Sequence, residues 1–287
     1  MKKIIDLFRH TFNTPYMIGE IGINHNGDIN IAKTLIDALN ACGWHSAKFQ
    51  KRNPDVCVPE HQKNITRDTP WGKIKYIDYK HKIEFGPKEY ETINDYCLEK
   101  SMDWSISVWD IDSLNFALNY DLPYIKIPSA HITNNELLEE SARSNIPIIL
   151  STGMSNWAMV DNAVEILGKT TNEFAVLHCN STYPAPIDEL HLNVIPEMKK
   201  RYGCIIGYSG HEYNLEPSVL AVAMGAQIIE RHITLDHNMW GTDQGSSLEV
   251  HAMDLLYKRI KEVNKILGSN EKIITDTEKP NLRKLRG

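Results

Sequence analysis

A chain of 287 residues, of which 42% are hydrophobic and 24% charged, is long enough to form one large α/β domain around a sizeable core. Its formal net charge of -6 argues against an electrostatic nucleic-acid binder, and no apolar run approaches the roughly 20 residues that cross a membrane. The five cysteines are scattered without a C-x-x-C pair, which predicts a reducing cytoplasm and no structural disulfide, with Cys179 and Cys204 as core residues.

Short apolar runs typical of buried strands alternate with amphipathic helical patterns along the chain. The strand-like runs cover residues 16–21, 46–49, 103–108, 124–127, 147–150, 174–178, 204–207 and 226–230. Helical patterns cover 31–41, 87–99, 134–143, 157–167 and 215–224, and a last helix is expected over 248–267. Strands too apolar for a sheet with one wet face, each followed by a helix or loop, predict a (β/α)₈ TIM barrel. The alternative is a doubly wound open sheet, but no G-x-G-x-x-G opens the chain.

Two segments do not belong to a minimal barrel. Residues 51–82 make a long connection after the second strand, and a connection of that length predicts a lid or binding loop. Residues 269–287 are polar and charged and are expected to form a loosely packed tail. We therefore predict a barrel domain over residues 1–268, with 51–82 as its lid-like loop, and a C-terminal tail.

The active site of a parallel barrel forms at the carboxyl ends of its strands. Polar side chains stand at these ends throughout the chain: Glu20, Asn24, His25, Lys48, Gln50, Ser107, Lys126, Ser129, Ser151, Thr152, His178, Ser181, Tyr183, Ser209, His211, Glu230 and His232. Such a collection predicts one reactive cup rather than scattered surface residues.

His211 and His232 follow the last two apolar runs, and histidines on neighbouring strand ends can share a divalent metal through neutral imidazole nitrogens. The alternative is a hydrogen-bonded pair without a ligand. If a metal is bound, Glu20 and Glu230 would hold metal-bound water; otherwise they would only neutralise the lysines.

Lys48 and Lys126, together with several serines, suit a phosphorylated anionic substrate, because ammonium groups neutralise phosphate and hydroxyls fill the remaining acceptor sites. Ion pairs with glutamate are the alternative for each lysine, and a Schiff-base lysine is a third interpretation. Asp243 lies in a loop whose glycine could bring it over the cup, to hydrogen-bond a polyhydroxylated substrate or to act as acid or base. An ordinary solvated loop is the alternative.

The strand-end motifs run in order along nearly the whole chain: Ile18–Asp28, Ala47–Gln50, Lys126–Ser129, Ser151–Met154, Leu177–Cys179, Thr182–Pro186, Gly207–Glu212, Glu230–Thr234 and Met239–Glu249. Together they resemble the sialic acid synthase (N-acetylneuraminate synthase) family. The resemblance implies a TIM-barrel transferase that condenses phosphoenolpyruvate with an N-acylated amino sugar, N-acetylmannosamine or similar, to a nine-carbon 2-keto acid and phosphate.

The resemblance also implies roles for individual residues. His211 and His232 would bind a divalent ion, manganese first with magnesium or cobalt as alternatives, that polarises the open-chain sugar aldehyde. Glu20, Asp243 and Glu230 are the expected catalytic residues. The expected substrate-binding residues are Lys48, Gln50, Ser107, Lys126, Ser129, Ser151, Ser181, Tyr183 and Ser209. Of these, Gln50 and Tyr183 would line the sugar side with Glu20 and Asp243.

Members of this family usually carry a C-terminal antifreeze-like domain that offers an arginine to the sugar of a partner subunit. The sequence stops at Gly287, so we expect the barrel alone, either as a homodimer or with a separate subunit that supplies the missing domain. Three alternatives stay open for the function. The acceptor could be a 6-phosphorylated N-acylmannosamine or a legionaminic or pseudaminic acid precursor, the protein could be a Schiff-base aldolase, or it could be a non-catalytic sugar-binding subunit.

Overall fold

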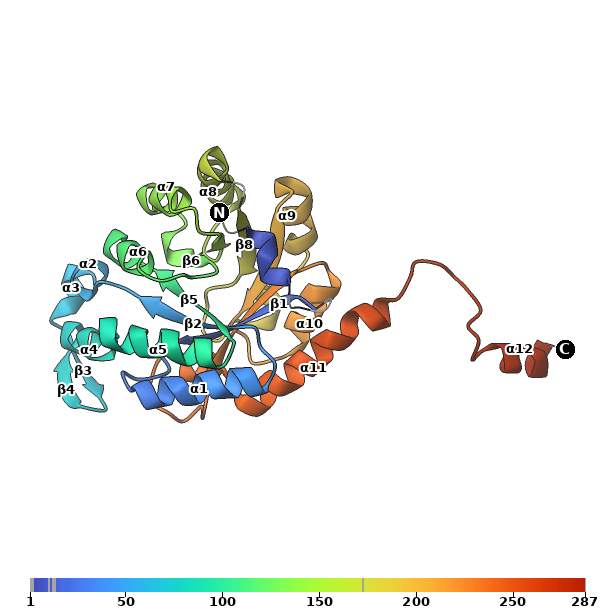
Figure 1. Ribbon diagram of the computed structural model, residues 1–287, viewed down its shortest axis with the longest axis horizontal. Helices are drawn as coiled ribbons and strands as arrows, with labels where there is room; N and C mark the ends of the chain where they lie inside the picture. Colours follow the sequence, from blue (N-terminus) through green and yellow to red (C-terminus); the bar gives the residue numbers. More distant parts are fainter. Residues whose placement is uncertain (1–2, 10, 12–13, 172, 287) are drawn as a thin grey trace.

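The computed structural model describes residues 3–9, 11, 14–171 and 173–286. Within these residues, parallel strands close into a barrel in the order β1, β2, β5, β6, β7, β8, β9 and β10, and β1 pairs with β10 to complete the ring (Figure 1). The strands are β1 (Tyr16–Gly22), β2 (Ser46–Lys51), β5 (Asp103–Val108), β6 (Ile125–Ile127), β7 (Ile148–Ser151), β8 (Phe174–Cys179), β9 (Ile205–Gly210) and β10 (Ile228–Thr234). The predicted (β/α)₈ fold is confirmed. A short parallel strand, β11 (Leu248–Glu249), continues the sheet beyond β10.

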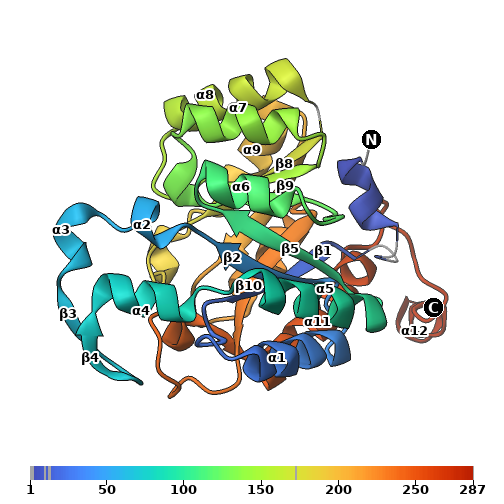
Figure 2. The same ribbon diagram turned by 60° about the vertical axis from the view of Figure 1, so that its left-hand side comes forward.

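Helices surround the strands as an outer layer (Figures 1 and 2). They are α1 (Ile29–Ala41), α5 (Pro87–Glu99), α6 (Ile111–Ala117), α7 (Asn135–Arg143), α8 (Trp157–Thr170), α9 (Val194–Tyr202), α10 (Glu216–Ala223) and α11 (Val250–Leu267). The sequence patterns did not predict α6 and α9. α6 has only 7 residues, and its start is fixed by Asp110, whose carboxylate accepts from the Ser113 amide at 2.7 Å. α9 is polar and ends at Gly203, which has a left-handed φ of 61°.

Two apolar layers form the core. The larger one lies between the strands and the helix ring, where α1 contributes Ala32, Leu35, Ile36 and Leu39. The smaller one fills the barrel itself with Tyr16, Ile18, Tyr124, Ile149, Ala175, Leu177 and Ile228. Ile4 and Leu7 of the 3₁₀ helix η1 (Ile4–Phe8) join this inner layer. The barrel interior is therefore packed rather than open.

The connection after β2 has secondary structure of its own. It contains α2 (Pro54–Cys57), α3 (Glu60–Lys63), the antiparallel hairpin β3 (Thr66–Thr69) and β4 (Gly72–Lys75), and α4 (Tyr76–Ile83). We call residues 54–83 the excursion. Tyr79 and Ile83 of α4 pack on Ile23 after β1, and both views place the excursion beside the carboxyl end of β2 (Figures 1 and 2).

The remaining elements are short 3₁₀ turns and a terminal helix. The turns are η2 (Ser129–His131), η3 (Ile187–Glu189) and η4 (Gln244–Ser246). The last helix, α12 (Lys279–Arg286), stands away from the barrel at the end of an extended segment (Figure 1). In the described part of the chain, none of the helices combines the length and apolarity that crossing a membrane requires.

Candidate active site

A cavity of about 180 Å³ opens at the carboxyl ends of the barrel strands. It is lined by Glu20, Lys48, Gln50, Ser107, Trp109, Lys126, Pro128, Ser129, Ala130, Ser151, Met154, Cys179, Ser181, Tyr183, Ser209, His211, Glu230 and His232. Every residue to which the family resemblance gave a catalytic, substrate-binding or metal-binding role lines this cavity except Asp243. The period-2 alternation of the strands explains the convergence, because residues such as Glu230 and His232 point to the same side of β10.

Two lysines and two glutamates form a buried charge cluster in the cavity. Lys48 Nζ lies 2.6 Å from Glu20 Oε2 and 3.5 Å from Glu230 Oε1, and Lys126 Nζ lies 3.1 Å from Glu230 Oε2. None of the four side chains is more than 4% exposed. Burial of this kind is tolerated only when each charge has a partner. The structure therefore shows the lysines as ion-paired, the alternative that the sequence left open.

The pKa values within this cluster are displaced by burial and by the neighbouring charges. Burial alone would raise the pKa of Glu230, but the ammonium groups of Lys126 and Lys48 outweigh it and hold the pKa at about 2. Burial raises the pKa of Glu20 despite the opposing charge of Lys48, and burial lowers the pKa of Lys126. Because the four charges cancel in pairs, an anionic substrate needs additional positive charge or protons here to bind tightly.

His211 and His232 face each other across the same cavity, with ring centroids 5.4 Å apart. His211 Nδ1 lies 2.6 Å from the carbonyl oxygen of Asn180, to which it donates, and the Tyr183 hydroxyl donates to His211 Nε2 at 2.9 Å. In the described part of the chain, His232 Nδ1 is buried without a hydrogen-bond partner. Burial lowers the pKa of His232 to about 3, so its imidazole is neutral at physiological pH.

The histidine pair fits a divalent ion by its chemistry. Neutral imidazole nitrogen is a common metal ligand, and the orphaned Nδ1 of His232 is a buried polar atom that a bound ion or its water would satisfy. Among the described residues, however, no group of three or more His, Cys, Asp or Glu side chains could hold a metal. Two protein ligands are thus available, and water or substrate atoms would have to complete the coordination.

The imidazoles are held in place by a second buried pair that the sequence analysis missed. Arg231 Nη1 lies 2.9 Å from Glu212 Oε1 and also donates to Ser218 Oγ at 3.0 Å, and both Arg231 and Glu212 are 0% exposed. These residues directly adjoin His232 and His211 and ion-pair with each other outside the cavity, tying β9 to β10. In the sequence the two charged residues adjoin the two histidines, as His211-Glu212 and Arg231-His232.

Two serine hydroxyls, of Ser129 and Ser181, lie close to the backbone of Gly153, just after β7. The Gly153 amide donates to Ser129 Oγ at 2.9 Å, and a Cβ on Gly153 would lie only 2.0 Å from Ser181 Oγ. Ser151 Oγ is buried and has no hydrogen-bond partner within the described residues. Two further hydroxyls already serve the charge cluster: Ser107 Oγ accepts from Lys48 Nζ at 2.8 Å, and Ser209 donates to Glu230.

Asp243 and Gln50 mark the outer part of the site. Asp243 Oδ2 lies 3.9 Å from His232 Nδ1, and its side chain is 17% exposed, so it stands at the rim rather than in the lining. Gln50 Nε2 donates to Glu20 Oε1 at 3.0 Å, and the guanidinium of Arg52 donates to Gln50 Oε1. Arg52 was not predicted as a site residue, because it lies after the end of β2 rather than within the strand.

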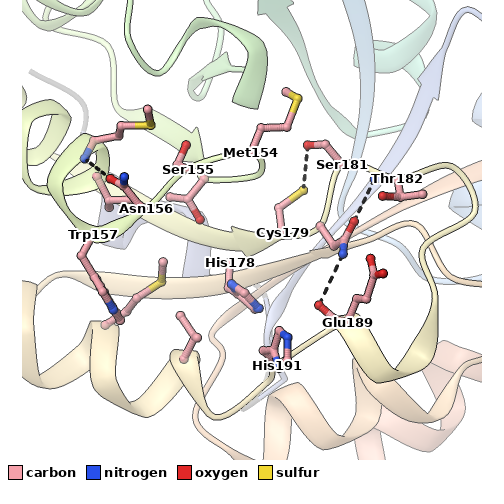
Figure 3. A pocket seen from close by; sticks show the side chains of 16 residues that line it. Met154, Ser155, Asn156, Trp157, His178, Cys179, Ser181, Thr182, Glu189 and His191 are labelled. Carbon is pink, nitrogen blue, oxygen red and sulfur yellow. Dashed lines mark hydrogen bonds between the residues drawn. The ribbon is translucent and has the colours of Figure 1, made fainter.

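Some strand-end residues lie elsewhere. His25 stacks on Phe85 with centroids 3.9 Å apart, and Asn24 donates to the carbonyl of Ile233 and to Ser247. His178 lines a larger neighbouring cavity of about 910 Å³ (Figure 3).

That larger cavity lies between α8 and α9 and shares Met154, Cys179 and Ser181 with the site (Figure 3). Cys179 is buried, as expected, and it also lines both cavities, with its Sγ 3.8 Å from His211 Nδ1. Trp109 and Met154 also line the site without having been predicted. Apolar lining residues carry no signal in the sequence that separates them from core residues.

Comparison with known proteins gives concordant matches. Residues 35–272 match the model of the NeuB family. The chain is 34% identical to an N-acetylneuraminate-9-phosphate synthase of Mus musculus, over 92% of this chain and 74% of that protein. It is 32% identical to an N,N'-diacetyllegionaminic acid synthase of Campylobacter jejuni, over 94% of this chain and 82% of that protein. Among solved structures, an N-acetylneuraminic acid synthetase from Leptospira borgpetersenii in complex with citrate superimposes with a TM-score of 0.84 at 31% identity, covering 96% of this chain and 93% of that one.

Proposed function

The chain belongs to the NeuB family, and from this premise we propose that it condenses phosphoenolpyruvate with an N-acylated amino sugar, giving a nine-carbon 2-keto sugar acid and phosphate. Several relatives are named as synthases of such sugar acids, but these names differ in the product, so the acceptor has to be argued from this chain's own residues.

One observation carries the proposal: two buried ammonium groups and two facing imidazoles share a single cavity at the carboxyl end of a closed barrel. The lysines supply ammonium donors whose charge Glu20 and Glu230 balance, and the hydroxyls of Ser129, Ser151 and Ser181 line the same cavity. Phosphate and carboxylate groups need both features. A neutral sugar alone would need neither lysine.

The reaction that these residues would support balances without a further reactant. C3 of phosphoenolpyruvate forms a bond to the aldehyde carbon of the open-chain sugar, water adds to C2, and the bond to phosphate then breaks to leave the 2-keto group. We propose that Glu20, whose pKa is raised by burial, and Asp243 at the rim move protons during these steps. Glu230, with its pKa held at about 2, remains a carboxylate and keeps both ammonium groups in place.

A divalent ion, manganese first with magnesium or cobalt as alternatives, is proposed for His211 and His232. When bound, such an ion supplies Lewis acidity toward the aldehyde oxygen and adds the positive charge that the neutral charge cluster lacks. The chain itself contributes the two imidazoles, that of His211 oriented by Asn180 and Tyr183 and that of His232 kept unprotonated by burial.

The metal proposal predicts that His232→Ala weakens Mn²⁺ binding at least about 100-fold, because even residues that only support a metal ligand typically cost 10- to 100-fold. Isothermal titration calorimetry measures the binding, and circular dichroism checks the fold. His178→Ala is the control, since His178 lies near the carboxyl end of β8 but lines the neighbouring cavity. Unchanged Mn²⁺ affinity in His232→Ala would remove the ion from this site.

Phosphate release from phosphoenolpyruvate tests the function directly, with and without Mn²⁺, across a panel of phosphorylated and unphosphorylated N-acylmannosamines and legionaminic and pseudaminic acid precursors. Release that depends on an amino sugar supports the synthase. No release with any sugar would instead favour a sugar-binding subunit. Borohydride trapping with pyruvate identifies the third alternative, because a covalent adduct at Lys126 or Lys48 would make the protein a Schiff-base aldolase.

The division of the chain is part of the same proposal. We propose that residues 1–268 form the synthase domain, that residues 51–82 act as its lid-like segment, and that 269–287 form a polar tail. The proposed assembly is a homodimer or a complex with a separate subunit that contributes to the sugar site.

A further inference from the structure

Lys80 in α4 is a buried cation without an anionic partner. Lys80 is only 9% exposed. In the described part of the chain, its ammonium group forms no hydrogen bond and no ion pair within 4 Å. Its contacts are the rings of Tyr76 and Tyr79, whose centroids lie 5.2 and 5.4 Å from Nζ. A buried charge normally has a counter-ion in direct contact, whereas the carboxylates that act on Lys80, those of Asp243 and Glu84, form no ion pair with it within 4 Å.

Arg52 is a second buried cation, and its charge acts on Lys80. Arg52 is 8% exposed and stacks 4.5 Å from the ring centroid of Trp109, and its Nε is buried with no hydrogen-bond partner among the described residues. The nearest carboxylate, Glu84, lies 3.7 Å from Arg52 Nε and is shared with Lys51 at 3.1 Å. Burial, and next the charge of Arg52, lower the pKa of Lys80 to about 8 against the opposing charges of Asp243 and Glu84, so the ammonium group is still mostly charged at pH 7.

These cations border the sugar side of the proposed active site. Trp109 lines the catalytic cavity, and Gln50 connects the Arg52 guanidinium to Glu20. On the other side, the ring of Tyr79 packs 5.0 Å from that of Trp240, in the loop that carries Asp243. Lys80 and Arg52 therefore lie next to the residues proposed for the acceptor, whereas the serines around Gly153 belong to other strands of the barrel.

We propose that Lys80 and Arg52 bind a phosphate monoester at the distal end of the acceptor, so that the substrate is a 6-phosphorylated N-acylated amino sugar. This inference rests on the proposed condensation. C6 is the carbon farthest along the chain from the C1 aldehyde, so its substituent reaches the rim while C1 reacts in the cavity. A phosphate dianion matches one guanidinium, which can donate two parallel hydrogen bonds, and one ammonium group.

The Lys80→Met variant tests this assignment, because methionine keeps the length and apolar contacts of the side chain and removes only the charge. Lys82→Met is the matched control, since Lys82 is an exposed lysine of the same helix. We measure kcat/KM for N-acetylmannosamine and for its 6-phosphate, the KM for phosphoenolpyruvate, and the affinity for each sugar by calorimetry, which does not require turnover.

The expected results separate the two acceptors. The unaltered protein should prefer the phosphorylated sugar, and Lys80→Met should lower kcat/KM and affinity for that sugar about 10- to 100-fold, the usual cost of a lost charged hydrogen bond. Its values for the unphosphorylated sugar and for phosphoenolpyruvate should stay within a few-fold, and Lys82→Met should match the unaltered protein throughout.

Two results would overturn the assignment. One is equal or tighter binding of the unphosphorylated sugar by the unaltered protein. The other is an equal loss for both sugars in Lys80→Met, which would give Lys80 a structural role. Neither result depends on the condensation reaction. If the proposed function fails, no phosphate is released with either sugar, but calorimetry still compares the binding of the two sugars.

Discussion

Gly153 lies where the hydroxyls of Ser129 and Ser181 meet, and its backbone amide donates to the first of them. A methyl group at this position would lie 2.0 Å from Ser181 Oγ and 3.0 Å from Ser129 Oγ, so at least one serine must move. The position therefore requires glycine because of close approach and not because of an unusual backbone angle.

Gly153→Ala should raise the KM for phosphoenolpyruvate by about 5- to 150-fold, which corresponds to the 1–3 kcal/mol that overpacking usually costs. Steady-state kinetics at saturating acceptor measure the change. Gly168→Ala is the control, because Gly168 lies inside α8 with no atom near its added methyl group, and this variant should gain about 0.5–1 kcal/mol of stability. An unchanged KM in Gly153→Ala would place the phosphate elsewhere.

At the scale of single residues, the sequence located the lining of the site but not its charge balance. Strand ends are visible as apolar runs that stop at polar residues, so Glu20, Lys48, Lys126 and His232 could be assigned to one rim. That the lysines would be ion-paired depends on distances between strands far apart in sequence. Arg231 was missed for a related reason, because its partner Glu212 is recognisable only once β9 and β10 are neighbours.

At the scale of elements, the excursion over residues 54–83 shows what sequence patterns miss. Its strands Thr66–Thr69 and Gly72–Lys75 are short, polar and largely exposed, so they carry no alternation of buried and exposed residues. Its helix α4 is fixed by tertiary contacts of Tyr79 and Ile83 with Ile23. Helices α1 and α5, by contrast, bury full apolar faces, and the ranges predicted for them agree with the structure to within two residues.

Contact between the excursion and the loop after β10 predicts a role in acceptor binding. Trp240 packs edge-on against Tyr79 with centroids 5.0 Å apart, and such pairs contribute about 0.5–1.5 kcal/mol beyond burial. Trp240→Ala should therefore loosen the loop that carries Asp243 and raise the acceptor KM about 2- to 10-fold, with the KM for phosphoenolpyruvate unchanged.

Kinetics with each substrate varied in turn measure this effect, and limited proteolysis of the loop reports its mobility. Trp157→Ala serves as the control, because Trp157 is 39% exposed, close to the 36% of Trp240, but lies on α8 away from the excursion. Equal changes in both Michaelis constants would mean that Trp240 supports the whole barrel rather than the acceptor end.

At the scale of the whole molecule, the barrel was predictable because its signal is repeated. Each βα unit must bury one strand on both faces and one side of a helix, so the apolar pattern recurs along the chain and single errors, such as the missed α6 and α9, do not change the topology. Closure between β1 and β10 follows from the count of strands. The residues around the rim of the barrel depend on the loops that connect strands and helices, and these loops are the least regular part of the sequence.

The folded chain also keeps several histidines neutral, which makes its stability depend on pH. Burial lowers the pKa of His25 to about 3 and that of His45 to about 4, compared with 6.5 for an exposed histidine. Between pH 6.5 and the folded pKa, the unfolded chain binds protons that the folded chain does not. The free energy of unfolding therefore falls as the pH falls, by about 1.4 kcal/mol per pH unit for each such group.

His25→Phe should remove one of these groups while keeping a ring against Phe85, on which His25 stacks at 3.9 Å. The variant loses the hydrogen bond from the Gly27 amide, so we expect it to be less stable at pH 7.5. Between pH 6 and 4, however, its unfolding free energy should fall less steeply, by about 1.4 kcal/mol per pH unit. Urea denaturation at four pH values measures both slopes, with the exposed His251 of α11 changed to alanine as the control. Parallel slopes for His25→Phe and the unaltered protein would mean that His25 takes up its proton in the folded state, and hence that the packing between the β1 loop and Phe85 opens in acid.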